Sequence, residues 1–183
     1  MNISDFEEIG LSSKKIFDGK IVKLFVDTVE LPNGQTATRE IVRHPGAVCV
    51  VPLTEDGEVI MVKQFRYPFS EVLLEIPAGK LEPGEDPLEA VKRELEEESG
   101  ALAGKITHLG EIYTTVAIFD EKIQLYIATD LTFINAHPDE DEFLEVTKIP
   151  LKSLVKMVMD GEIKDSKTQI AILKAEKYFY GEN

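Results

Sequence analysis

The sequence has little cysteine and comparatively few basic residues. Its 183 residues include a single cysteine, Cys49, so the chain can form neither an internal disulfide nor a zinc site made of thiolates. The 20 basic residues are outnumbered by 34 acidic ones, which gives a net charge of −14 and an isoelectric point near 4.7. Binding to nucleic acids and to anionic membranes relies on basic surfaces, so this balance argues against both kinds of partner.

Long apolar runs are also missing. No stretch approaches the roughly 18 consecutive apolar residues that a membrane-spanning helix needs. The acidic start of the chain, residues 1–8, lacks the basic-then-apolar order of a signal peptide. We therefore expect a cytoplasmic protein without a membrane partner. The three histidines have no spacing typical of metal ligands; they are His44, His108 and His137.

The length, set against roughly 150 residues per domain, predicts one main domain with an appendage. Residues 1–45 are expected to form antiparallel strands with a hairpin turn at Asn33 and Gly34, and residues 46–183 to form the main domain. Groups of strands with few helices between them predict the α+β class. Strands are expected at residues 20–31, 36–42, 47–53, 59–64, 72–76, 106–113, 122–130 and 144–149, and helices at 87–99, 151–159 and 166–179.

The ends of the first expected helix are marked clearly. Asp86 is of a type that caps helix N-termini, and Pro87 fits the first helical position. Glu89 stands three residues after Asp86, as in a capping box. Gly100 is suited to the left-handed position that ends a helix.

The glutamates of this helix predict a cation site. At about 100° per residue, Glu98 comes within about 20° of Val91, and Glu94 also lies at the edge of the apolar face. Glu94, Glu97 and Glu98 share one patch in the last turns, where like charges repel and the helix dipole disfavours anions. A divalent cation relieves both costs, and Mg²⁺ and Mn²⁺ prefer carboxylate oxygens. An ordinary charged helix with repeated glutamates is the alternative that spacing alone leaves open.

Residues 79–101 resemble the Nudix box. That motif is a glycine, five residues, a glutamate, seven residues, Arg-Glu, a bulky apolar residue, any residue, Glu-Glu, any residue, glycine and a bulky apolar residue. Its positions are filled here by Gly79, Glu85, Arg93, Glu94, Leu95, Glu97, Glu98 and Gly100, and only Ala101 departs, at a packing position. The resemblance implies the family's α/β/α sandwich around a mixed sheet.

The resemblance also implies hydrolysis of a nucleoside diphosphate linked to another group. In the family, the glutamates at the positions of Glu94, Glu97 and Glu98 bind the metal, Mg²⁺ with Mn²⁺ as a substitute. The backbone carbonyl at the position of Ala78 is a further ligand, and Glu85 is an accessory acid. Arg93 is expected to orient the glutamates through salt bridges, because Arg93 and Glu97 are an i, i+4 pair. The metal offsets the charge of the diphosphate and activates water.

Further segments are similar to the ADP-ribose pyrophosphatase branch of the family. They are residues 39–42, 45–48, 64–68, 74–81 and 160–168. Members of this branch convert ADP-ribose to AMP and ribose 5-phosphate and are commonly homodimers whose N-terminal strands reach the partner. In the branch, adenine stacks between an aromatic residue and an arginine, which makes Phe25 and Arg39 candidates. Arg66 matches a position that contacts the diphosphate.

Two further features come from the same resemblance. A glutamate of the loop matching residues 139–142 deprotonates the attacking water in this branch, so that Glu142 and Glu140 are both candidates for the general base. Val116 stands where the branch usually has a proline, which leaves the sugar nucleotide open.

Other functions are weighed against ADP-ribose hydrolysis. A related enzyme could cleave another nucleoside diphosphate sugar or a dinucleotide. A non-catalytic Nudix module that senses nucleotides is the alternative of a different class, but such a module has no need of the complete acidic set. Metal buffering is disfavoured because one small patch has little capacity.

Overall fold

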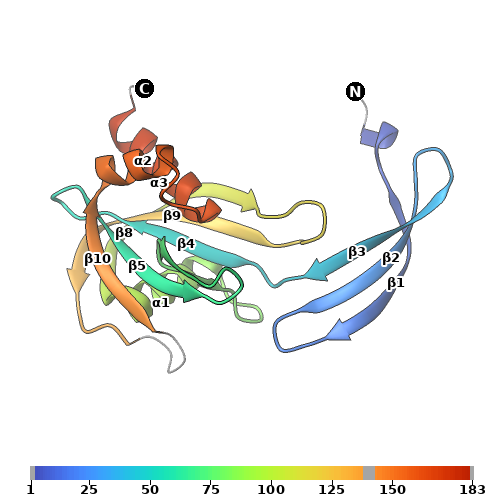
Figure 1. Cartoon of the computed structure of the whole chain (residues 1–183), viewed down its shortest axis with the longest axis horizontal. Coiled ribbons are helices and arrows are strands. Elements are labelled where there is room, and N and C mark those ends of the chain that lie inside the picture. The colour runs from blue at the N-terminus through green and yellow to red at the C-terminus, as the bar shows by residue number, and fades with distance from the viewer. Residues whose placement is uncertain (1–2, 138–142, 182–183) are drawn as a thin grey trace. The chain divides into compact units, whose positions relative to one another are not determined.

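The computed structural model describes residues 3–137 and 143–181. Its elements follow one another as Figure 1 shows. The described strands are β1 (Ile9–Asp18), β2 (Lys23–Glu30), β3 (Thr36–Arg43), β4 (Ala47–Pro52), β5 (Glu58–Arg66), β6 (Glu71–Glu75), β7 (Ala78–Lys80), β8 (Ala101–Tyr113), β9 (Lys122–Phe133) and β10 (Leu144–Pro150). The described helices are η1 (Ile3–Asp5), a short 3₁₀ turn, and α1 (Pro87–Ser99), α2 (Leu151–Met159) and α3 (Ser166–Tyr180).

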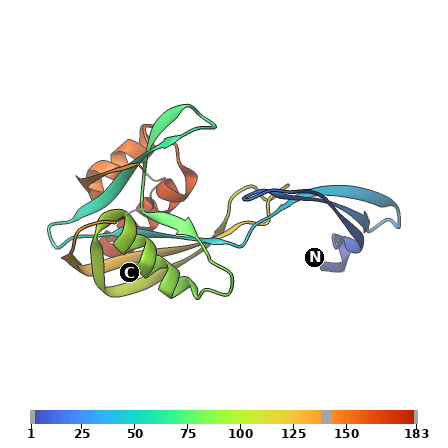
Figure 2. The same cartoon turned by 90° about the horizontal axis from the view of Figure 1, so that it is seen from below.

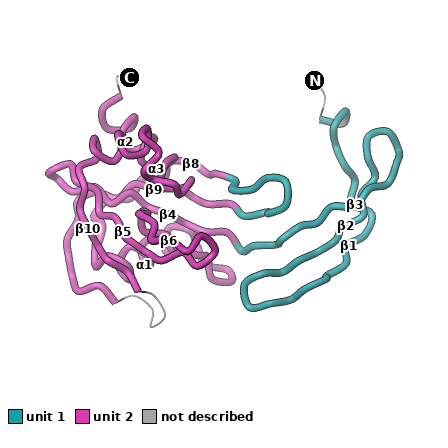
Figure 3. The backbone as a smooth tube through the Cα atoms, in the orientation of Figure 1, with its two compact units in different colours: residues 1–45, 113–121 teal, residues 46–112, 122–183 magenta. Residues whose placement is uncertain are grey.

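The chain forms two compact units, which Figure 3 distinguishes by colour. One unit contains residues 1–45 and 113–121, and the other contains residues 46–112 and 122–183. Pro45 is the last residue of the first segment of one unit, and Gly46 begins the other unit. The segment 113–121 belongs to the first unit because the backbone of Val42 and the side chain of Arg43 bond to it.

Strand β4 lies at the centre of the larger unit. It lies between β7 and β9 in a sheet of order β7-β4-β9-β8, antiparallel to β7 and parallel to β9, so the sheet is mixed. A second sheet has the order β10-β5-β6. All six residues of β4 are buried, which explains why its sequence is continuously apolar.

The two faces of β4 pack against different helices. Cys49 and Val51 belong to an apolar cluster with residues of α2 and α3, whereas Val48 and Val50 belong to a second cluster with residues of α1. Figure 2 shows α1 on one side of these strands and α2 with α3 on the other. The expected α+β class and α/β/α sandwich are therefore confirmed. Burial raises the pKa of the Cys49 thiol to about 12, in line with a packing role for this residue.

Asp86, Pro87 and Gly100 mark the ends of α1 as the sequence predicts, whereas the carboxylate of Glu89 pairs with Lys92 at 2.7 Å. The side chain of Asp86 accepts a hydrogen bond from the backbone N–H of Leu88 at 2.8 Å, and Pro87 is the first helical residue. At the other end Gly100 has φ of 67° and donates its N–H to the carbonyl of Glu96. These caps set where the helix begins and ends, and therefore which of its residues face the sheet.

The smaller unit is a three-stranded antiparallel sheet of order β1-β2-β3. Its β2–β3 turn is the expected hairpin, in which Gly34 has φ of 78° and Asn33 accepts a hydrogen bond from the N–H of Gln35. All ten residues of β1 are exposed. The exposed large side chains of β1 include Ile9, Leu11, Ile16 and Phe17.

Three strands differ from the expectation. Strand β1 starts at Ile9 within the region expected to form antiparallel strands, but its own bounds were not expected, because its central Ser-Ser-Lys-Lys run interrupts any alternation of apolar and polar residues. Strand β7 has only three residues, too few for a periodic pattern, and exists through its pairing with β4. Strand β8 begins at Ala101, directly after the helix, rather than at residue 106.

No helix among the residues that the structure describes is long and apolar enough to cross a bilayer.

Candidate active site

The glutamates of α1 lie where the helical spacing places them. Glu94 and Glu98 are buried, with 8% and 4% of their surface exposed, while Glu97 is half-buried. The predicted position of Glu94 and Glu98 at the edge of the apolar face is confirmed. Three carboxylates near the C-terminal end of a helix are unfavourable unless cationic groups compensate them.

Arg93 provides that compensation in this structure. Its Nε and Nη2 donate to the two carboxylate oxygens of Glu85 at 3.0 and 3.2 Å. Its Nη1 donates to Glu94 at 2.8 Å and to Glu97 at 3.0 Å. The expected pair between Arg93 and Glu97 is therefore confirmed, and the same guanidinium also fixes Glu85 and Glu94.

The pKa values follow from these contacts. The hydrogen bond to Glu85 is the main reason that the pKa of Arg93 lies above its usual range. The same bond, together with the N–H of Glu82, lowers the pKa of Glu85. Arg93 and Glu85 are consequently charged at neutral pH.

Strand β7 completes the cluster. The N–H of Ala78 donates to Glu98 at 3.0 Å, so the backbone of Ala78 lies beside this carboxylate. Gly79 packs against the head group of Glu94, where a Cβ atom at residue 79 would lie 1.8 Å from Glu94 Oε1. The space that a side chain at position 79 would occupy is thus filled by a carboxylate.

These groups suit a hard divalent cation. Glu94, Glu97, Glu98 and the carbonyl of Ala78 offer only oxygen donors, which Mg²⁺ and Mn²⁺ prefer. Across the described ranges 3–137 and 143–181, no group of three or more acidic, histidine or cysteine side chains is already drawn together around one point.

Arg66, the third predicted substrate contact, lies in the same unit as the box. Its Nε and Nη2 donate to both oxygens of Glu75, at 2.6 and 2.7 Å. Glu75 is 2% exposed and also accepts a hydrogen bond from Lys167. The guanidinium of Arg66 is therefore held in one orientation while 39% of its side chain stays exposed.

Sequence reasoning missed the partners of Arg66. Glu75 is the buried last residue of β6, and Lys167 lies in the first turn of α3, 92 residues further along the chain. A buried acid such as Glu75 needs cationic partners, which is a signal only once burial is known. By contrast, the role of Asp165 as the N-cap of α3 could be read from the local sequence. Its side chain accepts a hydrogen bond from the N–H of Thr168.

The two predicted adenine contacts belong to the smaller unit. Arg39 pairs with Glu8 and donates to the carbonyl of Thr38. The ring of Phe25 has Lys15 and Arg43 as its cationic neighbours, each 5.8 Å from the ring centre. Val116, also in this unit, is 79% exposed.

The two candidates for the general base, Glu140 and Glu142, lie outside the described residues. Their assignment stays a prediction.

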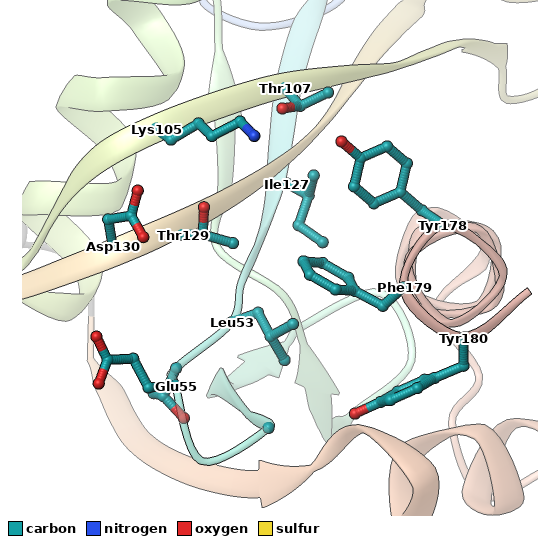
Figure 4. Close-up of a pocket in the computed structure, with 12 residues that line it drawn as sticks. Leu53, Glu55, Lys105, Thr107, Ile127, Thr129, Asp130, Tyr178, Phe179 and Tyr180 are labelled. Atoms are coloured by element: carbon teal, nitrogen blue, oxygen red, sulfur yellow. The ribbon is translucent and has the colours of Figure 1, made fainter.

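A separate pocket of about 440 Å³ lies where Leu53 follows the C-terminal end of β4 (Figure 4). Leu53 and Ile127 line its floor, and Tyr178 and Phe179 of α3 project into it. Its charged side chains, which include Lys105 and Asp130, are exposed. The pocket therefore lacks the desolvated, closely spaced charges that distinguish the box.

Two domain models match the chain. A model described as the NUDIX domain matches residues 42–169. A model described as the nucleoside diphosphate sugar hydrolase N-terminal domain matches residues 11–42.

Curated relatives match over nearly the whole chain. An ADP-ribose pyrophosphatase of Bacillus subtilis (strain 168) is 45% identical over 172 residues, or 93% of each chain. A protein of Bacillus methanolicus named methanol dehydrogenase activator is 46% identical over 169 residues, or 91% of each chain. An ADP-ribose pyrophosphatase of Mycobacterium tuberculosis is 36% identical, covering 88% of this chain and 79% of that one. A crystal structure of an ADP compounds hydrolase shares the fold, with a TM-score of 0.85 at 24% identity over 96% of this chain and 95% of that one.

Replacing Arg93 tests whether it compensates the carboxylates. Arg93→Gln leaves Glu85, Glu94 and Glu97 facing one another without their shared cation, so we expect the free energy of unfolding in EDTA to fall by about 2 kcal/mol. The neighbouring exposed pair of Lys92 with Glu89 offers a matched control, and Lys92→Gln should cost no more than about 0.5 kcal/mol. Urea unfolding measures both, and equal losses would show that Arg93 has no special part in the cluster.

Proposed function

Because this chain belongs to the Nudix family, we propose that it hydrolyses the diphosphate of ADP-ribose to AMP and ribose 5-phosphate with the help of a divalent cation. The observation that carries the proposal is the complete box, held together by Arg93 and by the N–H of Ala78. The substrate class is supported by the match to an N-terminal domain of nucleoside diphosphate sugar hydrolases and by the pyrophosphatases among the relatives.

Glu94, Glu97, Glu98 and the carbonyl of Ala78 would hold the cation, with Glu85 as an accessory acid. When bound, Mg²⁺ offsets the charge of a diphosphate and acidifies water, and Mn²⁺ is the expected substitute. Arg93 orients the carboxylates through its ion pairs with Glu85, Glu94 and Glu97.

Arg66 binds the diphosphate in this proposal. Its Nε and Nη2 are occupied by Glu75, and among the described residues its Nη1 has no hydrogen-bond partner. A guanidinium fixed on one edge and exposed on the other is preorganised for a phosphate oxygen. Phe25 and Arg39 of the smaller unit remain the candidates for the adenine ring.

The general base is proposed to be Glu142 or Glu140. A carboxylate close to the attacking water takes its proton and needs no other partner for this step. Separate Glu142→Gln and Glu140→Gln variants distinguish the two, because the base is the one whose loss lowers kcat and removes the acidic limb of the pH profile.

A homodimer is proposed from the exposed surface of the smaller unit. Val29 is the only large apolar side chain that is buried in the described part of its sheet, whereas Ile9, Leu11 and Phe17 of β1 are more than half exposed. A three-stranded sheet without a covering layer is marginal in water, and large apolar patches mark interfaces. A second copy of the chain is the proposed cover. A cytoplasmic location stays a prediction from the sequence.

Two alternatives follow from the relatives and the fold. The enzyme could prefer another nucleoside diphosphate sugar or a dinucleotide, since Val116 departs from the branch. The chain could also act on a protein partner, as the name of the relative from Bacillus methanolicus indicates for that protein. The complete acidic box favours hydrolysis over a purely binding role.

Product analysis tests the proposed function. ADP-ribose, ADP-glucose, GDP-mannose and diadenosine polyphosphates are incubated with the protein in Mg²⁺ or in EDTA. AMP and ribose 5-phosphate formed fastest, and only with metal, support the proposal. Faster cleavage of another of these compounds would identify that compound as the preferred substrate. Nucleotide binding without cleavage of any of the compounds contradicts hydrolysis.

Glu98→Gln is expected to lower kcat by about 100-fold or more, because a metal ligand loses its charge. The fold should persist, since the glutamine oxygen can still accept the N–H of Ala78. Glu96→Gln makes the same charge change at a side chain of α1 that is 39% exposed and pairs with His137, and should keep its activity. Steady-state kinetics at saturating Mg²⁺ compare the two, and near-normal turnover of Glu98→Gln would rule out the metal assignment.

Phe17→Asp is expected to separate the proposed dimer, because it places a charge in the apolar surface of β1. Ser12→Asp adds the same charge to the same strand at a polar position and should leave the dimer intact. Light scattering after size exclusion measures the mass, which should be twice 20.5 kDa for the wild type and 20.5 kDa for Phe17→Asp. A wild-type protein that elutes as a monomer would contradict the proposal.

A further inference from the structure

The segment from Glu75 to Ala78 joins β6 to β7 and carries the backbone beside the box. Three successive backbone groups of this segment are held from three different elements. The N–H of Ile76 donates to Thr168 Oγ1 of α3 at 3.1 Å, and the carbonyl of Pro77 accepts from the N–H of Val50 in β4 at 3.0 Å. The N–H of Ala78 donates to Glu98 of α1. The position of Ala78 is therefore set jointly by α3, β4 and α1.

Thr168 is the contact that comes from furthest away in the sequence. It is completely buried and lies 92 residues from Ile76. Its hydroxyl donates to Asp165 Oδ2 at 2.6 Å and accepts a hydrogen bond from the N–H of Ile76. The hydroxyl therefore has a defined partner both as donor and as acceptor. The N–H of Thr168 also donates to Asp165 Oδ2. The N-cap of α3 thus fixes the rotamer of the side chain that holds β6 and β7.

The same helix end is connected to Arg66. Lys167 donates to Asp165 at 3.0 Å and to Glu75, and Glu75 holds the guanidinium of Arg66. Burial alone would raise the pKa of Glu75, but the hydrogen bonds from Arg66 and the charge of Lys167 outweigh it, and the pKa lies below its usual value. Burial would lower the pKa of Lys167, but Asp165 and Glu75 reverse this. Arg66, Glu75 and Lys167 are therefore charged at neutral pH.

We infer that Thr168 is a positioning residue of the active site, which acts through the backbone of Ile76 to keep Ala78 and Glu98 in the register that binds a divalent cation. This inference rests on the proposed function, since it assigns those two groups to the metal. Pro77 lies between the N–H of Ile76 and that of Ala78. Its ring fixes its own φ and so reduces the freedom of one N–H to move relative to the other. A metal site binds its metal more weakly when the groups that orient its ligands are removed.

The ordinary alternative is that Thr168 only satisfies a buried N–H. In that case its removal lowers the stability of the whole domain without changing the metal site in the folded protein. The two roles differ in what they do to Mn²⁺ affinity measured on folded protein, and the test uses that difference.

The experiment compares Thr168→Val, Thr168→Ser and Ile172→Val. Valine keeps the shape of threonine and removes the hydroxyl, serine keeps the hydroxyl, and Ile172→Val is a matched core change one turn further along α3 at a completely buried position. Mn²⁺ binding is measured by electron paramagnetic resonance without nucleotide. Amide hydrogen exchange is followed in the peptide that contains residues 74–79, and kcat and KM are measured with ADP-ribose.

We expect Thr168→Val to weaken Mn²⁺ binding by about tenfold and to lower kcat by a similar factor, with KM changed less than about twofold. Exchange in residues 74–79 should accelerate. Thr168→Ser should return each value to within about twofold of the wild type, and Ile172→Val should leave the dissociation constant of Mn²⁺ and the exchange of this peptide unchanged.

Equal Mn²⁺ affinity and equal exchange in Thr168→Val and Ile172→Val would overturn the inference while leaving hydrolysis by the wild type intact. Failure of the proposed function is recognised differently, because the wild type itself would then neither bind Mn²⁺ at the box nor cleave ADP-ribose. The inference would also be overturned if Thr168→Val lost Mn²⁺ binding and Thr168→Ser did not restore it, since the hydroxyl would then not be the group responsible.

Discussion

The charge balance at the C-terminal end of α1 is the constraint on which the site depends. Glu94 and Glu98 are buried beside Glu97, at the helix end where the dipole disfavours anions. Such a cluster persists only if cationic or N–H groups compensate it, and Arg93 and the N–H of Ala78 do so in this structure. A divalent cation would compensate the same oxygens from the substrate side. The cluster is costly for the fold and suited to metal binding for the same reason.

The rest of the larger unit keeps this cluster in place. The buried strand β4 packs against α1 on one face and against α3 on the other, so the same strand positions both helices. Strand β7 pairs with β4 and brings Ala78 and Gly79 to the carboxylates. Arg66 is held by Glu75, and Glu75 is in turn bonded to Lys167 at the start of α3. The proposed metal site and the proposed diphosphate contact therefore share one scaffold.

Much of this could be predicted from local sequence. Asp86, Pro87 and Gly100 mark the ends of α1 by their own backbone preferences, and the burial of Glu94 and Glu98 follows from counting along the helix. Strand β7 and the contacts of Arg66 could not be predicted in this way. They depend on partners distant in sequence, as with Glu75 and Lys167, and no periodic pattern reports such a pairing.

The most direct test of the account is the Mg²⁺ dependence of unfolding in the wild type and in Glu98→Gln, measured in urea at fixed ionic strength. If the buried carboxylates bind the cation, Mg²⁺ at 100 times its dissociation constant stabilises the wild type by about 2.7 kcal/mol and leaves Glu98→Gln nearly unaffected. Equal stabilisation of both proteins, or of neither, would contradict the central claim that the box glutamates form the metal site.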